Sequence, residues 1–125
     1  MAGASAGSLR LPRQRHLRLR CDFIRIRGEG RRLSNGCMTV NWLPRSPGSF
    51  SRLGVVTSRR LGPAVLRNRA RRLLREAYRL HQDELIQPVD LVLIARPSIL
   101  GRRLTDVERD LLGVLRRESL LKKCP

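Results

Sequence analysis

The sequence of 125 residues is poor in aromatic side chains, in acidic side chains and in lysine. Aromatic residues make up 3% of it, and ten acids stand against 27 basic residues, of which 25 are Arg. Genomic codon bias can account for Arg in place of Lys, but it does not account for the shortage of acid. A net charge of +17 therefore predicts a polyanionic partner, and RNA or DNA is the first candidate.

Long apolar runs and paired cysteines are absent as well. No stretch reaches the roughly 18 apolar residues of a membrane span. Residues 1–8 lack the basic start and the apolar middle of a secretory signal, so we expect a cytoplasmic protein with no membrane partner. Cys21, Cys37 and Cys124 are far apart and odd in number, which favours neither a disulfide framework nor a zinc site. We interpret Cys21 and Cys37 as small packing residues.

The basic charge is concentrated in the first two thirds of the chain. Residues 1–80 hold 19 Arg and three acids, a net of +16, whereas residues 81–125 hold eight basic and seven acidic residues, a net of +1. A solubility device or a diffuse membrane-surface charge would be spread more evenly. We therefore expect the partner to contact the first two thirds of the molecule.

The length suits one small domain. We place it at residues 16–121, after a basic and flexible arm at residues 1–15 and before a short tail at 122–125. Hydrophobic periodicity predicts the order helix, strand, strand, helix, strand, helix, and hence an α+β fold: a two-layer sandwich with a three-stranded sheet. The expected elements are a short helix capped by Asp22 and ended by Gly28 and Gly30, strands at 37–43, 52–57 and 89–95, a helix at about 64–81, and a final helix to about residue 120 with a capping box of Thr105 and Glu108.

The helix predicted at about 64–81 carries its charge on one side. Six Arg and one acid occupy residues 67–79. Like charges at i,i+4 destabilise a helix by a few tenths of a kcal/mol per pair, so a phosphate backbone is the natural counterpart. A solvated polar face is the alternative interpretation. At about 100° per residue, one face holds Leu66, Ala70, Leu73, Leu74, Ala77 and His81, and the opposite face holds Asn68, Arg71, Arg72, Arg75 and Arg79.

The segment from Ser51 to Tyr78, SRLGVVTSRRLGPAVLRNRARRLLREAY, resembles the signature of the bacterial ribonuclease P protein subunit. It has the family's strand, basic pair and Gly-containing turn, followed by a helix with Arg-Asn-Arg, a second basic pair and Arg-Glu. HLRLRCDF from His16 resembles the start of the family's first helix, and DLVLIAR from Asp90 resembles its third strand. A dozen ordered positions make this match specific, which an Arg-Asn-Arg triplet alone would not.

The resemblance implies the accessory subunit of an endoribonuclease, in which a catalytic RNA holds most of the Mg²⁺ and removes the 5′ leader of precursor tRNA. It implies no catalytic residue and no dedicated metal site in the protein. The expected partners are the ribonuclease P RNA and precursor tRNA, with no obligate protein partner. It also implies helices on one side of the sheet and a left-handed crossover between the parallel strands. The residues expected at the catalytic RNA are Arg59, Arg60, Arg67, Asn68, Arg69, Arg71, Arg72, Arg75 and Arg79.

The resemblance further implies a cleft between the first helix and the sheet that holds the single-stranded leader. Phe23 matches the family's aromatic residue, and a base stacked on such a ring contributes about 1–3 kcal/mol. A core position for Phe23 is the alternative. Arg27 and Asn41 stand where relatives often carry further aromatics, so we expect leader binding to lean on Arg and polar groups. The predicted leader-binding residues are Phe23, Arg27, Asn41 and Ser58, of which Ser58 could instead be a cap or turn residue.

Two other functions compete with this interpretation. A protein-based nuclease would need clustered carboxylates or a His pair, but seven of the ten acids follow residue 80 among basic residues, and His16 and His81 have no partner pattern. A ribosomal or architectural RNA-binding protein of similar fold suits the composition equally well, and the ordered match around Arg67 separates the two. Trp42 and Tyr78 are expected in the core.

Overall fold

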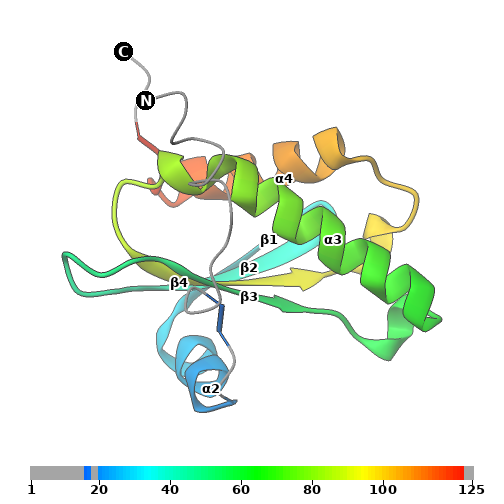
Figure 1. The fold of residues 1–125 in the computed structure, drawn as a ribbon, viewed down its shortest axis with the longest axis horizontal. Helices are drawn as coiled ribbons and strands as arrows, with labels where there is room; N and C mark the ends of the chain where they lie inside the picture. The colour runs from blue at the N-terminus through cyan, green and yellow to red at the C-terminus, as the bar shows by residue number, and fades with distance from the viewer. Residues whose placement is uncertain (1–15, 18–19, 123–125) are drawn as a thin grey trace.

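The computed structural model describes residues 16–17 and 20–122 (Figure 1). The predicted arm at residues 1–15 and most of the predicted tail lie outside the described residues. In chain order the elements, with η for a short 3-10 helix, are α2 (Arg20–Glu29), β1 (Arg31–Asn35), β2 (Met38–Pro44), β3 (Arg52–Val56), η2 (Arg59–Leu61), α3 (Ala64–His81), η3 (Gln82–Glu84), β4 (Val89–Ala95), η4 (Pro97–Ile99) and α4 (Leu104–Arg117).

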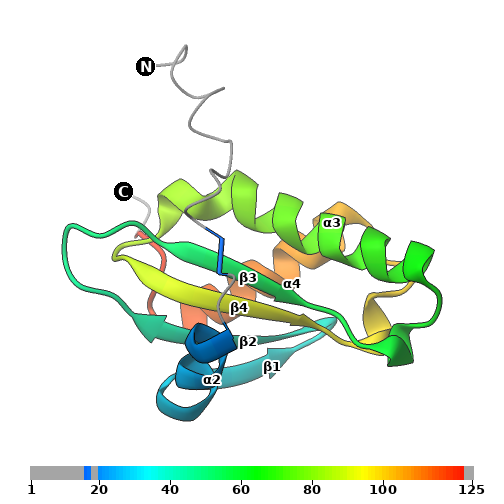
Figure 2. The same cartoon turned by 60° about the horizontal axis from the view of Figure 1, so that its bottom comes forward.

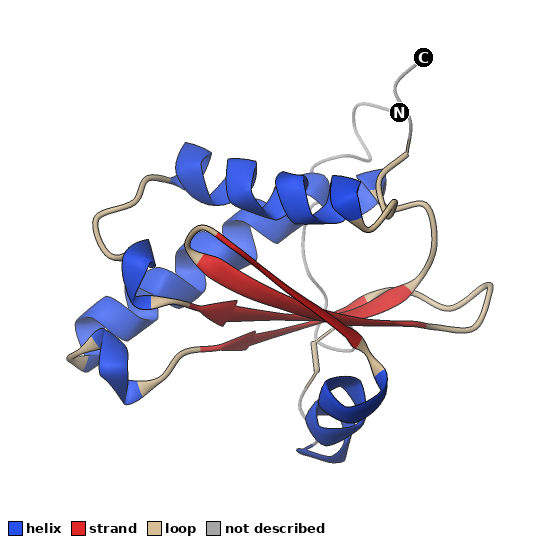
Figure 3. Ribbon diagram, turned by 180° about the vertical axis from the view of Figure 1, so that it is seen from behind, coloured by secondary structure: helices blue, strands red, loops and turns tan. Residues whose placement is uncertain are grey.

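A mixed sheet of four strands, in the order β1-β2-β4-β3, forms the centre of the fold (Figure 2). The pairs β1–β2 and β2–β4 are antiparallel, and β3–β4 is parallel. Helices α3 and α4 lie on one face of the sheet and α2 lies on the other (Figures 1 and 3). The predicted α+β class is confirmed, but the expectations of three strands and of helices on one side only are wrong.

The strand missed by the sequence analysis is β1, which lies at the edge of the sheet. Its sequence, RRLSN, has one apolar residue, Leu33, opposite Val40 of β2. Edge strands tolerate such polar composition because one side of the backbone meets solvent. The turn into β2 uses Gly36 with a φ of 57°, a conformation that glycine adopts readily. The Asn-Gly pair at this turn was the available signal for a hairpin.

The main core lies between the sheet and the pair α3 and α4. From α3 it takes Ala70, Leu74, Ala77 and Tyr78, and from α4 Val107, Leu111, Val114 and Leu115. Trp42 and Tyr78 are 7% and 2% exposed, so their predicted core positions are confirmed. Leu66 is 36% exposed and does not belong to the buried face of α3.

The connection from β3 to β4 runs through η2 and α3, and it joins two parallel neighbours as the resemblance implies. The bounds of α3 agree with the predicted helix at about 64–81. The left-handed sense of this crossover stays a prediction.

Three smaller expectations need correction. Helix α4 begins at Leu104, and the Arg103 N–H donates to Asp106 Oδ2 at 3.1 Å, so Thr105 lies inside the helix and caps nothing. Helix α2 begins at Arg20, which places Asp22 in its first turn, and it continues through Gly28.

The two described cysteines differ from each other. Cys21 is exposed on α2, so its predicted packing role is wrong. Cys37 is buried, as predicted, and burial together with a hydrogen bond to Asp110 raises the pKa of its thiol to about 12. Neither thiol takes part in the surfaces described below.

In the part of the chain that the structure describes, no helix is long and apolar enough to cross a membrane.

Candidate nucleic-acid interface

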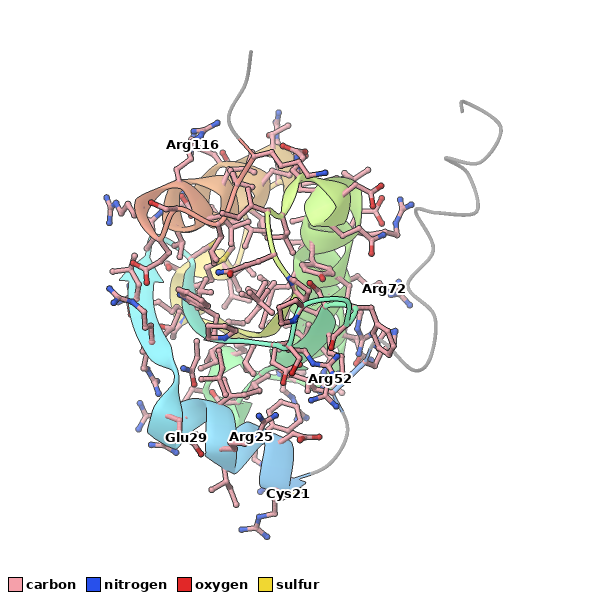
Figure 4. All side chains as sticks on the ribbon, turned by 90° about the vertical axis from the view of Figure 1, so that its left-hand side faces the viewer. Cys21, Arg25, Glu29, Arg52, Arg72 and Arg116 are labelled. Atoms are coloured by element: carbon pink, nitrogen blue, oxygen red, sulfur yellow. The ribbon has the colours of Figure 1, made fainter. Side chains whose placement is uncertain are left out.

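The charged face of α3 points away from the sheet. Figure 4 shows Arg72 projecting outward from this helix. The helical spacing predicted this outer face correctly, because every basic residue lies off the buried stripe. Asn68, Arg69, Arg72 and Arg75 are exposed, and Arg67, Arg71 and Arg79 are half-buried.

Carboxylates balance little of this charge. Arg79 donates from Nε and Nη2 to Glu76 at 3.0 and 2.5 Å, and this hydrogen bonding holds the pKa of Glu76 below its usual value. Arg71 donates to the Asn68 amide oxygen, which orients its guanidinium without neutralising it. Among the described residues, the arginines of α3 other than Arg79 form no ion pair. The outer face of α3 therefore keeps most of its positive charge.

Arg67 is unusual within this set. Its Nε is buried and has no hydrogen-bond partner among the described residues. A buried donor without a partner is uncommon in folded proteins and calls for an explanation. The half-buried guanidinium of Arg67 is thus held at the start of α3 without an internal acceptor at Nε.

The segment between β3 and α3 extends the basic surface. Arg59 and Arg60 are exposed on η2, which leads into the N-terminal end of α3 (Figure 1). Ser58 is exposed just before η2 and makes no side-chain capping hydrogen bond. Ser58 nevertheless occupies the N-cap position of η2, where its carbonyl accepts from the Leu61 N–H at 3.1 Å, so the alternative interpretation of Ser58 as a cap or turn residue is confirmed for its backbone.

On the opposite face of the sheet, α2 leaves part of the strands uncovered. Strand pairing aligns Thr39, Ile94 and Val56 in one row on this face, next to the row that lies under α2. Val56 is 37% exposed and Ile94 is half-buried. Because Ser58 follows Val56 by two residues, this partly open row leads from the sheet toward η2.

Phe23 lies on α2 beside this row. Its ring packs with the small cluster of Leu17, Ile26 and Val92 and remains half-buried. The ring also rests on Gly54, where an ideal Cβ would lie 2.7 Å from Phe23 Cε1. Phe23 is therefore both a packing residue and partly accessible. One turn further along α2, Arg27 is exposed.

Asn41 is the one predicted leader residue that lies inside the protein. It is 3% exposed. Its Nδ2 donates to the Ile26 carbonyl at 3.1 Å and to the Arg31 carbonyl at 2.8 Å. Asn41 thus fastens the end of α2 and the start of β1 to the middle of the sheet.

A buried carboxylate lies where α2 meets the sheet. Asp90, the second residue of β4, is 1% exposed and accepts two hydrogen bonds of 2.8 Å from Arg52. Arg25 of α2 donates to it at 2.9 Å, and Arg45 lies 3.6 Å away. Burial opposes ionisation, but the bonds from Arg52 and the charge of Arg45 outweigh it and keep the pKa of Asp90 below its usual value.

Over the described residues, no group of three or more His, Cys, Asp or Glu side chains could hold a metal ion. The exposed guanidinium groups suit phosphate oxygens, and the partly accessible ring of Phe23 suits a stacked base.

A family model described as Ribonuclease P matches residues 11–119. This chain belongs to the ribonuclease P protein family. As such it is a subunit of the ribonuclease P ribonucleoprotein endoribonuclease, an RNA-binding protein of tRNA processing. Membership implies association with the ribonuclease P RNA.

Relatives within the ribonuclease P protein family cover nearly the whole chain. The ribonuclease P protein component of Desulfovibrio desulfuricans is 43% identical over 111 residues, which are 86% of this chain and 85% of that protein. That of Clostridioides difficile is 32% identical and covers 86% of this chain and 95% of its own length.

Solved structures of ribonuclease P proteins share the fold. The protein from Thermotoga maritima is 34% identical with a TM-score of 0.71, and it covers 82% of this chain and 96% of its own. The protein from Staphylococcus aureus is 27% identical with a TM-score of 0.77, over 86% and 98% of the two chains.

Two features of the ribonuclease P fold escaped the sequence analysis. One is the burial of the Asp90 carboxylate, and the other is the contact of Gly54 with the ring of Phe23. The aspartate at the start of an otherwise apolar strand was a signal, because a buried acid needs partners. The contact between Gly54 and Phe23 had no sequence signal, since it depends on how α2 lies on the sheet.

Proposed function

We propose that the outer face of α3 binds the ribonuclease P RNA and that the surface beside α2 binds the 5′ leader of precursor tRNA. In this proposal the RNA carries out the cleavage that yields the mature tRNA 5′ end and holds the required Mg²⁺, and the protein contributes no catalytic group. The observation that carries it is the row of exposed arginines on α3 without carboxylate partners. An RNA backbone supplies phosphates at a spacing that such a row can contact.

The RNA-binding surface comprises the outer face of α3 and the adjoining η2. Arg69, Arg72 and Arg75 are exposed, and Arg67 contributes a guanidinium whose Nε lacks an acceptor among the described residues. Arg79 contributes less charge because Glu76 is bound to it. The complete set in the proposal is Arg59, Arg60, Arg67, Asn68, Arg69, Arg71, Arg72, Arg75 and Arg79.

The leader site comprises Phe23, Arg27, Ser58 and Asn41. The partly accessible ring of Phe23 supports base stacking, and exposed Arg27 supports a phosphate contact. The partly open row through Ile94 and Val56 provides apolar surface between them and Ser58. Asn41 contributes by holding the Ile26 carbonyl at the edge of this site.

Reconstitution with a bacterial ribonuclease P RNA tests both parts. At low Mg²⁺, the purified protein should allow cleavage of precursor tRNA. Replacing Arg72 and Arg75 together by Ala should weaken assembly with the RNA at least tenfold and lower the log–log salt slope by about 2, because two phosphate contacts are lost. Phe23→Ala should leave assembly unchanged and lower affinity for precursor tRNA more than for mature tRNA.

Arg116→Ala is the matched control for the α3 substitutions. Arg116 is an exposed arginine of α4, on a different part of the surface from Arg72 (Figure 4). Arg116→Ala removes one positive charge, as each of the α3 substitutions does, but it should change the affinity for the ribonuclease P RNA by no more than a factor of about two. Equal losses per replaced arginine from the Arg72 and Arg75 pair and from Arg116→Ala would show that net charge, not the face of α3, binds the RNA. Equal losses of precursor and mature tRNA affinity in Phe23→Ala would reject the leader site.

A further inference from the structure

Helix α2 is attached to the sheet by few apolar contacts. Among the described residues, the cluster under it has Leu17, Ile26 and Val92 as buried members, with Phe23, Leu43 and Ile94 packed at its margin. The opposite face of the sheet buries a much larger core against α3 and α4. So small an apolar contact fixes the position of a helix weakly, and polar contacts must contribute to its placement.

Apart from the bond of Asn41 to the Ile26 carbonyl, the polar contacts between α2 and the sheet converge on Asp90. Arg25 reaches it from α2, and Arg52 reaches it from β3 with a bidentate pair of hydrogen bonds. Asp22, also on α2, lies 3.6 Å from Arg52 and 3.4 Å from Arg25. Figure 4 shows Arg25 and Arg52 next to each other where α2 meets the sheet. Two charged side chains of α2, Asp22 and Arg25, are thereby tied to two different strands, β3 and β4.

The position of these ties along α2 matters for Phe23. Asp22 precedes it directly, and Arg25 follows it by two residues, so the helix is held on both sides of the ring. Gly54, over which the ring lies, is the neighbour of Val92 in the parallel pair, two residues beyond the Arg52–Asp90 pair. A rotation of α2 about its axis would break the ion pairs of Asp22 and Arg25, and the same rotation would move the ring off Gly54.

We propose that Asp90 is a positioning residue for leader binding: its buried carboxylate fixes the rotation of α2 on the sheet and so places the ring of Phe23. This inference rests on the leader site proposed above. It assigns to Asp90 no contact with RNA. Buried ion pairs add little net stability relative to apolar residues, but they fix geometry when their hydrogen bonds are directional. The bidentate bond from Arg52 is of that kind.

The location of Asp90 predicts which binding step it affects. Its side chain lies on the α2 face of the sheet, whereas α3 lies on the other face. Loss of the carboxylate should therefore loosen α2 and leave the outer face of α3 as it is. A change in leader binding without a change in RNA assembly is the expected signature.

The experiment uses the full chain with Asp90→Asn, assembled with a bacterial ribonuclease P RNA. Affinity for precursor tRNA should fall about tenfold, while affinity for mature tRNA and for the ribonuclease P RNA should change less than twofold. Equal losses for precursor and mature tRNA would overturn the inference, since general destabilisation acts on both. Unchanged precursor affinity in a folded Asp90→Asn protein would overturn it as well.

Two further variants serve as a milder change of the same interaction and as a control. Arg25→Gln removes one tie but leaves Asp90 bonded to Arg52, so it should fold and show a smaller loss in the same direction. Glu118→Gln is the matched control. Glu118→Gln removes the same charge as Asp90→Asn, but Glu118 accepts at 2.6 and 3.0 Å from Arg31 of β1 and Trp42 of β2 and not from a side chain of α2. It should leave the ratio of precursor to mature affinity unchanged, and an equal change of that ratio in Glu118→Gln would contradict the inference.

A double-mutant cycle with Phe23→Ala separates this inference from the proposed function. If Asp90 acts through the ring, Asp90→Asn should cause no further loss of precursor affinity once Phe23 is Ala. Additive losses would show that Asp90 acts elsewhere and overturn the inference. A Phe23→Ala protein with unchanged leader discrimination would instead reject the leader site itself.

Discussion

Gly54 limits what can occupy the sheet beneath Phe23. An ideal Cβ at this position would lie 2.7 and 2.8 Å from Phe23 Cε1 and Cζ and 3.2 Å from Leu17 Cβ. Carbon atoms in contact prefer about 3.5–4.0 Å, so a methyl group here displaces the ring. Gly54→Ala should lower the free energy of unfolding by about 1–3 kcal/mol, measured by urea denaturation.

Gly28→Ala is the matched control for that substitution. Gly28 lies within α2, and an added Cβ would meet nothing within 4 Å. In a helix, alanine should stabilise by about 0.5–1 kcal/mol relative to glycine. The two glycine replacements should thus have opposite signs, and a gain in stability for Gly54→Ala would show that the ring yields to the methyl group.

For single residues, the sequence predicted the direction of a side chain on its helix but not its contacts with distant parts of the chain. Spacing alone placed Arg72 and Arg75 on the outer face of α3, because a helix converts sequence separation into direction. It could not place Phe23 over Gly54 or Asp90 beside Arg25, because these contacts join residues far apart in sequence. The resemblance supplied Phe23 as a candidate but supplied nothing about the groups that hold it.

At the scale of elements, strong periodicity gave the reliable predictions. Helix α3 and the strands β2, β3 and β4 were expected close to their observed bounds because each has a clear apolar stripe or run. The edge strand β1 has a single inward apolar residue, and its pairing depends on β2. The sequence also did not determine which face of the sheet α2 covers, since a short helix with few apolar residues can pack on either side.

The C-terminal end of α3 is joined to two neighbouring elements by His81. Its Nδ1 lies against Glu84 of η3, and its Nε2 lies 2.7 Å from Glu108 of α4. Burial opposes the charged imidazole, but the hydrogen bonds with Glu108 and Glu84 outweigh burial and raise the pKa of His81 above its usual value. These partners had no signal in the sequence pattern, because Glu108 lies on a different helix and meets His81 through the packing of α3 on α4.

The direction of that shift predicts how stability depends on pH. The folded state holds the proton more tightly than the unfolded chain, so the contribution of His81 is complete below about pH 6.5 and is lost as pH rises through its folded pKa. Between about pH 6 and pH 8.5, the wild type should lose about 1 kcal/mol of unfolding free energy more than His81→Gln. Urea denaturation at both pH values measures this. Parallel pH curves for the two proteins would show that folding leaves the proton affinity of the imidazole unchanged.

At the scale of the whole molecule, the net charge of +17 acts on the free protein and on its complex in opposite ways. Within the free protein, like charges repel, and added salt screens them. In the complex, salt competes with the arginines for phosphates by opposing counterion release. The fold tolerates this charge because the arginines of α3 lie outside the core, and because Asp90 and Glu118 form ion pairs with Arg52 and Arg31.

Raising NaCl from about 20 to about 300 mM should therefore stabilise the free protein and weaken its binding to the ribonuclease P RNA. A gain of about 1 kcal/mol from screening would raise Tm by roughly 4 °C, measured by thermal denaturation. Over the same range the log–log slope of RNA affinity should have a magnitude of about 4 or more, as expected for six phosphate contacts. Arg72→Ala should reduce both effects, since it removes one repelling charge and one contact. A flat binding response would show that the arginine face of α3 does not meet phosphates, whatever the stability of the free protein.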